Sequence, residues 1–507
     1  MLNLNKHYPY LVWPIILIVI YAMAMLRPIH QDDGWYASFA LRYLADLSFF
    51  DNPSFFSYSD SNGGNDSPGG FLFSSLQSLF SALFGFSINS VRILNALSIT
   101  IILALVHQII SFQFPRIRWW ITAVLLFNPV FYYHFYNRPE TVAAALMLVS
   151  IWLLLSKGND NKMVFLAYFI WALILDTHPI AIFGVVGLGC WFWIKNLNKS
   201  LYVVSGGLSG LSVILILNQL INGNLGLFAG LAGQVPVNFG DHYVPLLESD
   251  FTDYLRIAKE RFNTIKSFLL LSGIVILVPL VIYAQKGVGF LRHPLVINYL
   301  FFIFFATIGT EAYSNGFALY SIISLLLLYA AFIESWPRLL GFKYWFILFI
   351  PLIGWSLKST ASSLVSYYAY QKNFDDKYQE FGDCIDQNAK ILMRPTFVFA
   401  TADKGLHSDY FYGILQVMLD NQMSFDQALI LRDYDYIVLD DRNLNEDLFI
   451  DKRDEKQFDN PAYSKYRTIG ISSSDFQVLI QNRFLEPVCE FEEISHGKSI
   501  LYKVNKP

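Results

Sequence analysis

Charged residues are scarce in this chain. Only 15% of its 507 residues are Asp, Glu, Lys or Arg, whereas 54% are hydrophobic, and the mean hydropathy is +0.41. A soluble domain carries about a quarter charged residues, so the composition predicts a polytopic membrane protein. The net charge of −4 argues against a nucleic-acid partner.

Cysteine is also rare, with three residues in the chain. Cys190 lies in an apolar run, whereas Cys384 and Cys489 lie in the C-terminal part. A disulfide between these two stays open, because two distant cysteines pair only if their side of the membrane is oxidising. The sequence has no Walker loop and no GxGxxG, HExxH or CxxC motif, so nucleotide hydrolysis, dinucleotide redox chemistry and thiol–metal chemistry have no support.

The topology follows from the loops between the apolar runs. Five short basic loops fall at alternate turns, and the positive-inside rule places them in the cytoplasm with the N-terminus. Only one net crossing then fits between the run 10–26 and the basic loop at Arg116, although two runs lie there. The run 71–86 contains five polar residues, so we predict that it lies at the outer interface or dips partly into the membrane, without crossing it. Twelve runs occur, at about 10–26, 70–86, 91–111, 118–135, 141–156, 163–175, 179–194, 201–220, 266–284, 295–312, 316–333 and 344–362, which leaves about eleven transmembrane helices.

The composition changes at about residue 363, where charges become dense and the apolar runs shorten. Four segments, 396–400, 434–440, 476–480 and 499–504, are typical of strands. The fold class is therefore a mainly α membrane protein with external juxtamembrane helices and a small C-terminal soluble α/β domain. We predict two domains, 1–362 in the membrane and 363–507 outside the cytoplasm.

Two adjacent carboxylates, Asp32 and Asp33, directly follow the first apolar run. A carboxylate beside hydrocarbon is costly, so it is either solvated at the interface or retained for function. Asp32 and Asp33 could cap a helix that begins near Gly34, or they could act in catalysis, and one aspartate could do each. The aromatic residues and Arg42 that follow at helical spacing are typical of an interfacial helix.

Two further polar groups lie in predicted external loops. In "YNRPE", Pro139 suits the first turn of a helix and Glu140 is favourable at its N-terminus. Arg138 is then free to contact a phospholipid headgroup or a substrate. In "LDTHP", Asp176 and His178 could ligate a metal ion or a phosphate, although a lone pair is a weak signal.

Two other features have different interpretations. Gly206, Gly210 and the glycine-rich run 223–233 indicate close helix packing or a turn rather than a phosphate-binding loop. Arg256, Lys259 and Arg261 form a basic stripe in a predicted external loop, against the general charge trend. This exception suggests an anionic lipid or lipid-phosphate partner.

The segment Asp32-Asp33-Gly34-Trp35-Tyr36-Ala37, placed after a first span, resembles the D-[DE]-x-x-[YF]-A motif of the polytopic GT-C glycosyltransferases. These include the protein O-mannosyltransferases and the bacterial aminoarabinose transferases, which use polyprenyl-phosphate sugars. "RPE" at 138–140 is similar to the motif that carries their second acidic residue, and "LDTHP" is similar to bacterial members. One departure is "NDSPGG", where Asp66 and Ser67 stand in place of the basic residue that precedes the proline in aminoarabinose-type members.

The resemblance implies a glycosyltransferase that moves a sugar from a polyprenyl-phosphate donor to an acceptor hydroxyl on a lipid, glycan or protein. The site would face the extracytoplasmic side of a bacterial inner membrane. Asp32 would act as the base, and Asp33 and Glu140 would orient it or share a divalent cation. The substrate-binding residues would be Tyr36, Arg42, Arg138, His178, Arg256, Lys259 and Arg261.

Two matters stay open. No cofactor is fixed by the sequence, and a divalent cation, if one is bound, would be held by Asp32, Glu140, Asp176 or His178. The alternative function is a transporter or flippase for lipid-linked sugars. That function would need charged or broken helices near mid-membrane, whereas the ionisable groups here lie at the outer ends of the predicted spans.

Overall fold

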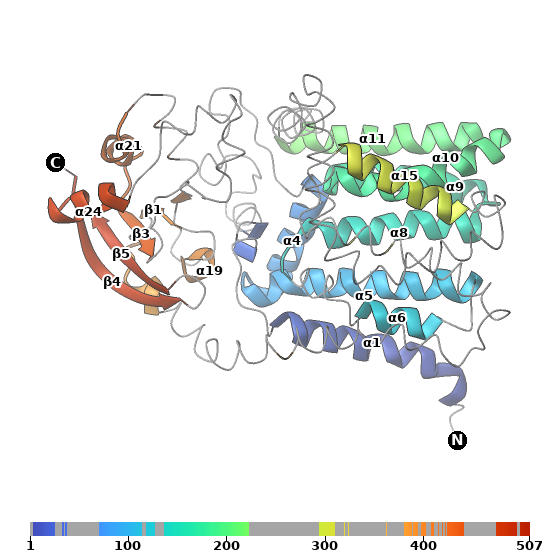
Figure 1. Cartoon of the computed structure of the whole chain (residues 1–507), viewed down its shortest axis with the longest axis horizontal. Coiled ribbons are helices and arrows are strands. Elements are labelled where there is room, and N and C mark those ends of the chain that lie inside the picture. The colour runs from blue at the N-terminus through green and yellow to red at the C-terminus, as the bar shows by residue number, and fades with distance from the viewer. Residues whose placement is uncertain are drawn as a thin grey trace, which may run out of the picture. The chain divides into compact units, whose positions relative to one another are not determined.

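The structure is a computed structural model in which the chain forms two compact units (Figure 1). The helical unit comprises Met1–Arg27, Pro68–Phe80 and Val91–Val365, and the sheet unit comprises Pro28–Ser67, Ser81–Ser90 and Ser366–Pro507. The domain boundary near 363 stays a prediction. The structure describes residues 4–25, 33–34, 36–37, 70–113, 118–126, 136–222, 294–309, 380–387, 389–393, 397–401, 407–409, 423–440, 473–493 and 497–506, with single residues at 319, 323, 361, 414, 418 and 421.

The helical unit is a bundle whose long helices run side by side (Figure 1). In it α9 packs between α8 and α11, and α10 packs against α15. Its described helices are α1 (Leu4–Met25), α4 (Gly70–Phe84), α5 (Ile88–Gln113), α6 (Arg118–Leu126), α8 (Pro139–Lys157), α9 (Asn161–Thr177), α10 (Phe183–Lys195), α11 (Ser200–Asn222) and α15 (Pro294–Gly309), with short 3-10 turns at Pro179–Ile182 and Leu197–Lys199.

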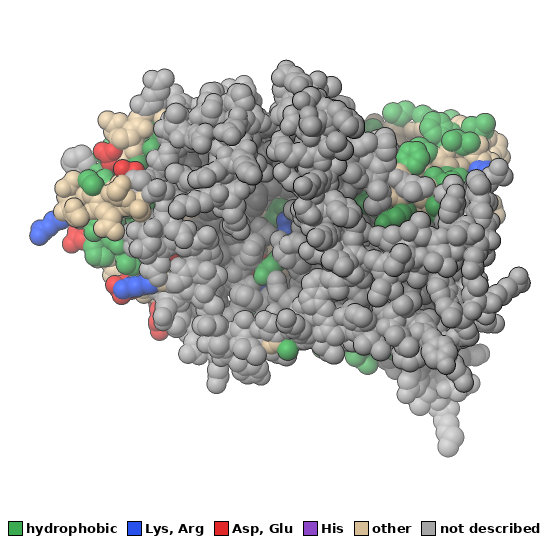
Figure 2. Space-filling model, in the orientation of Figure 1, with side chains coloured by type: hydrophobic (Ala, Val, Ile, Leu, Met, Phe, Trp, Pro, Cys, Tyr) green, Lys and Arg blue, Asp and Glu red, His purple; other side chains and the backbone are tan. Residues whose placement is uncertain are grey.

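Three described helical segments are long and apolar enough to cross a membrane, namely Ile88–Ser111, Pro139–Lys157 and Leu197–Leu217. Three shorter segments are also apolar, Val12–Met25, Leu72–Phe84 and Phe183–Lys195. The number of eleven spans and the non-crossing position of 71–86 stay predictions. The helix α11 exposes large apolar side chains such as Leu201 and Leu208, and Figure 2 shows hydrophobic side chains gathered along this part of the surface.

Small residues let α11 approach α9 closely. A Cβ atom on Gly210 would lie 2.5 Å from the backbone oxygen of Phe169, and one on Gly206 would collide with the backbone of Phe165. The prediction that these two glycines serve helix packing is therefore confirmed.

A buried side chain joins α15 to α10. Asn298 is 3% exposed, and its amide nitrogen donates to the Gly184 carbonyl oxygen (2.6 Å) while its amide oxygen accepts from the Leu188 N–H (2.9 Å). Gly184 and Leu188 are four residues apart, so their groups would normally bond to each other within the helix. The Asn298 amide is thus inserted into the hydrogen-bond ladder of α10.

The sheet unit contains a five-stranded mixed sheet in the order β2-β1-β3-β5-β4. The strands β2, β1 and β3 are parallel, and β3, β5 and β4 are antiparallel. The helices α21 and α24 share one core with the sheet, where the Phe425 and Phe476 rings meet edge to face at 5.3 Å. The elements are β1 (Lys390–Leu392), α19 (Val398–Thr401), β2 (His407–Asp409), α21 (Phe425–Leu431), β3 (Tyr436–Asp440), α24 (Ser473–Gln481), β4 (Leu485–Glu493) and β5 (Gly497–Val504).

Two of the four predicted strands are correct and two are wrong. The segment 434–440 contains β3 and the segment 499–504 lies within β5, but 396–400 and 476–480 fall largely in the helices α19 and α24. A short apolar run does not distinguish a strand from a buried helix. In α24, Phe476 is buried whereas Val478 is 52% exposed, so the pattern that looked like a strand is one face of a short helix.

A disulfide joins Cys384 to Cys489, with their Cα atoms 6.3 Å apart. Cys489 lies on β4, which is the edge strand of the sheet, and Cys384 precedes β1. The question that the sequence left open is answered by this pairing, which ties the edge of the sheet to a segment 105 residues earlier.

Candidate functional site

Polar side chains are buried together where α4, α5 and α8 meet in the helical unit. We call this set the polar cluster. Burying an amide or a charge in apolar surroundings is costly, and such groups within apolar helices usually mark a functional site. The cluster consists of Gln77, Asn95, Asn137, Glu140 and Thr141, each at most 2% exposed, and of Arg138, whose side chain is 15% exposed.

The cluster is built around the start of α8. Arg138 is the N-cap residue in an extended conformation, Pro139 occupies the first turn, and Glu140 follows it. Proline fits here because its missing N–H has no partner in the first turn anyway, and a carboxylate is favourable near the positive end of the helix dipole. The predicted helix start at "RPE" is confirmed.

Amide side chains from two other helices hold the segment before α8. Gln77 on α4 donates through Nε2 to Asn137 Oδ1. Asn95 on α5 donates through Nδ2 to the Tyr136 carbonyl oxygen. The Thr141 hydroxyl lies 3.1 Å from Asn95 Oδ1 and 3.2 Å from the Arg138 carbonyl oxygen, both acceptors for its proton. The backbone that carries Arg138 is therefore held by side chains of α4, α5 and α8.

The charged part of the cluster is an ion pair. Arg138 Nη2 lies 3.2 Å from Glu140 Oε1, and the Glu140 side chain is 3% exposed. The half-buried imidazole of His178, just after α9, lies within electrostatic reach of both groups. Burial lowers the pKa of His178, the Glu140 carboxylate opposes that change, and Arg138 adds to the lowering. The imidazole is therefore neutral at neutral pH, and one cation and one anion remain.

Asp176 has a defined contact with α4. Its Oδ2 atom accepts a 2.8 Å hydrogen bond from the backbone N–H of Leu72, in the first turn of that helix. Such N–H groups have no partner within their own helix, so Asp176 satisfies one from a distant part of the chain. Within the described ranges, no three His, Cys, Asp or Glu side chains group as metal ligands. The suggestion of a divalent cation involving Asp32, Glu140, Asp176 or His178 stays untested.

Among the other predicted site residues, Asp33 and Tyr36 are described and belong to the sheet unit. Both are helical and buried, as are Gly34 and Ala37, which agrees with a helix that begins near Gly34. Their predicted roles stay predictions. Five predicted site residues lie outside the described residues: Asp32, Arg42, Arg256, Lys259 and Arg261.

The sequence analysis missed Gln77, Asn95 and Arg92. The Arg92 side chain, on α5, is buried and donates from Nη1 to the Ala24 carbonyl oxygen (2.7 Å), at the end of α1. All three residues are polar groups inside apolar runs, which is a signal of functional or packing roles. The polar residues of the run 71–86, which include Gln77, were used only to predict its topology. The polarity of Arg92 and Asn95 was not used.

No family model matches the sequence, and no curated protein matches it. Among solved structures, the chain is similar to ArnT from Cupriavidus metallidurans bound to undecaprenyl phosphate, with a TM-score of 0.58, 11% identity and 98% of each chain covered. It is also similar to the apo state of the same protein, with a TM-score of 0.52, 10% identity and 98% of each chain covered. ArnT is an aminoarabinose transferase of the GT-C class. The predicted resemblance to GT-C glycosyltransferases is therefore confirmed at the level of the fold, over almost the whole chain.

Proposed function

We propose that this chain is a GT-C glycosyltransferase that moves a sugar from a polyprenyl-phosphate donor to an acceptor hydroxyl outside the cytoplasm. The observation that carries this proposal is the buried Arg138–Glu140 pair at the start of α8, within a fold shared with a protein whose crystal structure holds undecaprenyl phosphate. A buried cation beside a carboxylate is what transfer from a lipid phosphate requires.

The reaction needs two kinds of group. The acceptor oxygen bonds to C1 of the sugar while a carboxylate takes its proton, and we assign this role to Asp32. The bond from C1 to the phosphate oxygen breaks and its electron pair stays on the phosphate, where positive charge stabilises it. Arg138 is our candidate for that charge. A donor phosphate would compete with Glu140 for the guanidinium, which couples donor binding to the freedom of the Glu140 carboxylate.

The remaining assignments rest on the resemblance and on charge. Asp33 and Glu140 would orient the base, or share a divalent cation with it, and the cation would then stabilise the leaving phosphate. The neutral His178 imidazole can donate one hydrogen bond to a phosphate oxygen. The other proposed donor contacts are Tyr36, Arg42, Arg256, Lys259 and Arg261.

The disulfide supports placing the site outside the cytoplasm. Disulfides persist in oxidising compartments and are rare in the cytosol, and Cys384 and Cys489 both lie in the C-terminal tail. The predicted topology puts that tail on the same side as the segments that carry Asp32 and Arg138.

The central experiment is Asp32→Asn, assayed as sugar transfer from polyprenyl-phosphate donors in purified protein. If Asp32 only caps a helix, the change should cost little, since Asn and Asp are equally good caps. If it is the base, the rate should fall about 10²- to 10⁴-fold. Asp33→Asn is the matched control, and a larger loss there would assign the role to Asp33. Near wild-type activity in both variants would contradict the assignment.

The topology has its own test in a Cys190→Ser background. Cysteines introduced at Ser61 and Ser408 should react with a membrane-impermeant reagent added from outside, and one at Asn159 should not. Reaction of the Ser61 position only after permeabilisation would reverse the orientation and move the site to the cytoplasm.

A further inference from the structure

The helix α4 carries its polar and apolar side chains on unexpected sides. Its polar residues are nearly all buried, and its large apolar residues near the C-terminal end are exposed. A helix on the surface of a soluble domain shows the opposite arrangement. The buried residues are Ser74, Gln77, Ser78 and Ser81, each at most 3% exposed, and Leu79, Leu83 and Phe84 are 52%, 67% and 58% exposed.

This arrangement suits a helix with lipid on one side and a polar interior on the other. The apolar side chains lose nothing when they face hydrocarbon. The buried polar groups, in contrast, lose their hydration and need partners in the interior. The hydrogen bonds of the buried face therefore indicate which polar groups the protein itself satisfies and which are left for a ligand.

Two of the buried polar groups are satisfied by the protein itself. The Ser78 hydroxyl donates to the Ser74 carbonyl oxygen at 2.8 Å, one turn earlier in the helix. The Gln77 amide nitrogen donates to Asn137 Oδ1, in the polar cluster.

Two other groups are not. Gln77 Oε1 and Ser81 Oγ are buried and have no hydrogen-bond partner among the residues that the structure describes. Gln77 and Ser81 are four residues apart, so their side chains lie one above the other on the same face of α4. That face thus offers a buried carbonyl acceptor and a hydroxyl that can both donate and accept.

We propose that Gln77 and Ser81 bind hydroxyl groups of the donor's sugar. The inference rests on the proposed function and names the sugar-binding part of the same site. A neutral amide oxygen and a neutral hydroxyl match the hydroxyls of a sugar, whereas an anionic phosphate requires donors or positive charge. The position fits as well. C1 of the sugar is bonded to the phosphate, and Gln77 contacts Asn137, the neighbour of the proposed phosphate-binding Arg138.

The experiment compares two probes on the purified full-length protein: undecaprenyl phosphate alone, and undecaprenyl phosphate carrying glucose, mannose or aminoarabinose. The variants are Ser81→Ala and Gln77→Met, and the matched control is Ser78→Ala, because Ser78 is equally buried on the same helix but bonded to its own backbone. Each test variant should weaken binding of the sugar-bearing lipid about threefold to tenfold, the effect of one neutral hydrogen bond. Binding of undecaprenyl phosphate alone should not change in Ser81→Ala, and the control should leave both affinities unchanged. Gln77→Met also removes the bond to Asn137, so there the sugar-bearing lipid should lose more affinity than undecaprenyl phosphate alone.

Three results would overturn the inference. Equal weakening of both probes would mean that the residues act through Arg138 or through folding, and Ser81→Ala guards against this ambiguity for Gln77, since Ser81 has no described contact with Asn137. Unchanged affinity of the test variants for the sugar-bearing lipid, in a wild-type protein that transfers sugar, would refute this inference alone. Failure of the wild-type protein to bind or transfer from any lipid of the panel would refute the proposed function, and this inference with it.

Discussion

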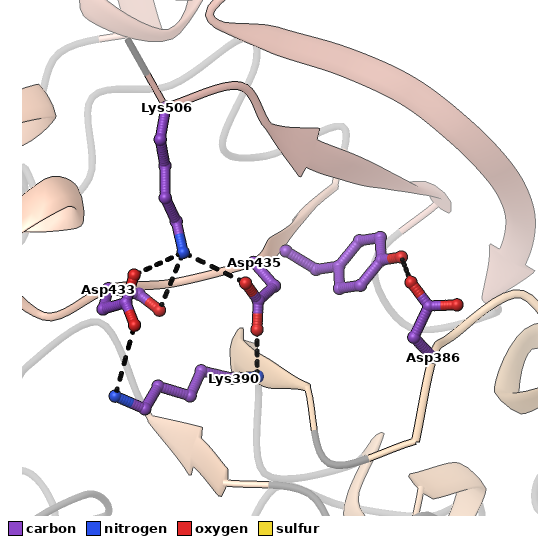
Figure 3. A network of polar contacts seen from close by, with 6 residues as sticks. Asp386, Lys390, Asp433, Asp435 and Lys506 are labelled. Carbon is purple, nitrogen blue, oxygen red and sulfur yellow. Dashed lines mark hydrogen bonds and ion pairs between the residues drawn. The ribbon is translucent and has the colours of Figure 1, made fainter.

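The two units each contain a network of charged and polar side chains, and the networks differ in depth. In the polar cluster, the Arg138 and Glu140 side chains are 15% and 3% exposed. In the sheet unit, Lys506 Nζ lies 2.5 Å from Asp433 Oδ1 and 3.0 Å from Asp435 Oδ1, with side chains that are 31%, 65% and 43% exposed (Figure 3). The Lys506 contacts are shorter than the 3.2 Å Arg138–Glu140 contact, but their side chains are more exposed and are therefore screened more by water.

The difference in burial changes what each network contributes to the free energy of folding. An exposed ion pair gains little because water solvates the separated charges almost as well. The Lys506 network therefore contributes little stability. It links Lys506 to the turn before β3, where Asp435 also accepts from the Lys390 backbone N–H at 2.9 Å. A buried pair costs several kcal/mol of desolvation per ion, which is why we propose a functional role for the pair in the polar cluster.

The largest effect should come from breaking the buried pair. Arg138→Ala leaves the Glu140 carboxylate buried without its cation, and should destabilise the helical unit by about 3 to 5 kcal/mol. The double variant Arg138→Met with Glu140→Leu should recover most of that stability, because neither charge of the pair remains. Thermal unfolding in detergent measures the stability of each variant, and a binding assay measures its affinity for the donor. Donor binding should stay lost in the double variant, and wild-type donor use by either variant would mean that another group holds the phosphate.

The next effect concerns the covalent link in the sheet unit. Replacing both Cys384 and Cys489 by Ser removes a cross-link over 105 residues, and should lower the stability of the sheet unit by about 2 to 4 kcal/mol. The measurement is denaturant unfolding with and without reductant. Cys190→Ser is the control, because Cys190 is a free thiol on α10. If the double variant lost as much stability on addition of reductant as the wild-type protein, the effect would belong to another group.

A smaller effect compares one residue type at two depths. Asn298 is 3% exposed and bonds to two backbone groups of α10, whereas Asn196 is partly exposed and donates to the Phe192 carbonyl oxygen at 2.8 Å. Asn298→Leu should cost about 1 to 3 kcal/mol, since two buried hydrogen bonds are lost. Asn196→Ala should cost less, because water can replace the lost bond. Equal costs by thermal unfolding would contradict the role of depth.

The smallest effect should follow loss of the exposed network. Lys506→Met should change the unfolding midpoint of the sheet unit only slightly, and less at high salt. The hydrogen bond from Lys506 lowers the pKa of Asp433 below its ordinary value of 3.8, so its contribution is present above pH 3.8 and is lost as the pH falls below that. A large destabilisation at neutral pH would show that exposure does not decide the strength of these pairs.

The same network predicts an alkaline limit. Burial and the hydrogen bond to Asp386 raise the pKa of Tyr436 to about 12, and the Tyr436 hydroxyl donates to Asp386 Oδ2 at 2.5 Å. Partial burial alone would lower the pKa of Lys506, but its bonds to Asp433 and Asp435 raise it above 10.5. Both contributions are present below about pH 10 and are lost as the pH rises through the folded values. Tyr436→Phe should flatten the stability of the sheet unit between pH 10 and 12, followed by circular dichroism.

Local patterns of the sequence were sufficient for several features. The start of α8 at Pro139 and the packing role of Gly206 and Gly210 depend on backbone chemistry that neighbouring residues specify. The strands β3 and β5 were predicted from continuous apolar runs. The segments 396–400 and 476–480 were wrongly predicted as strands, because the same run suits a strand or a helix until its partners are known.

Composition, basic loops and the segment around Asp32 and Asp33 were by themselves enough to predict a membrane protein and a resemblance to GT-C enzymes, since hydropathy, charge asymmetry and short motifs are local properties. Only the tertiary structure decided which polar groups meet. Gln77 on α4 bonds to Asn137, just before α8, and Asp176 on α9 bonds to Leu72 on α4, across 60 and 104 positions of the chain. Such contacts depend on how helices pack, and burial then turns ordinary amides, a guanidinium and a carboxylate into a candidate site.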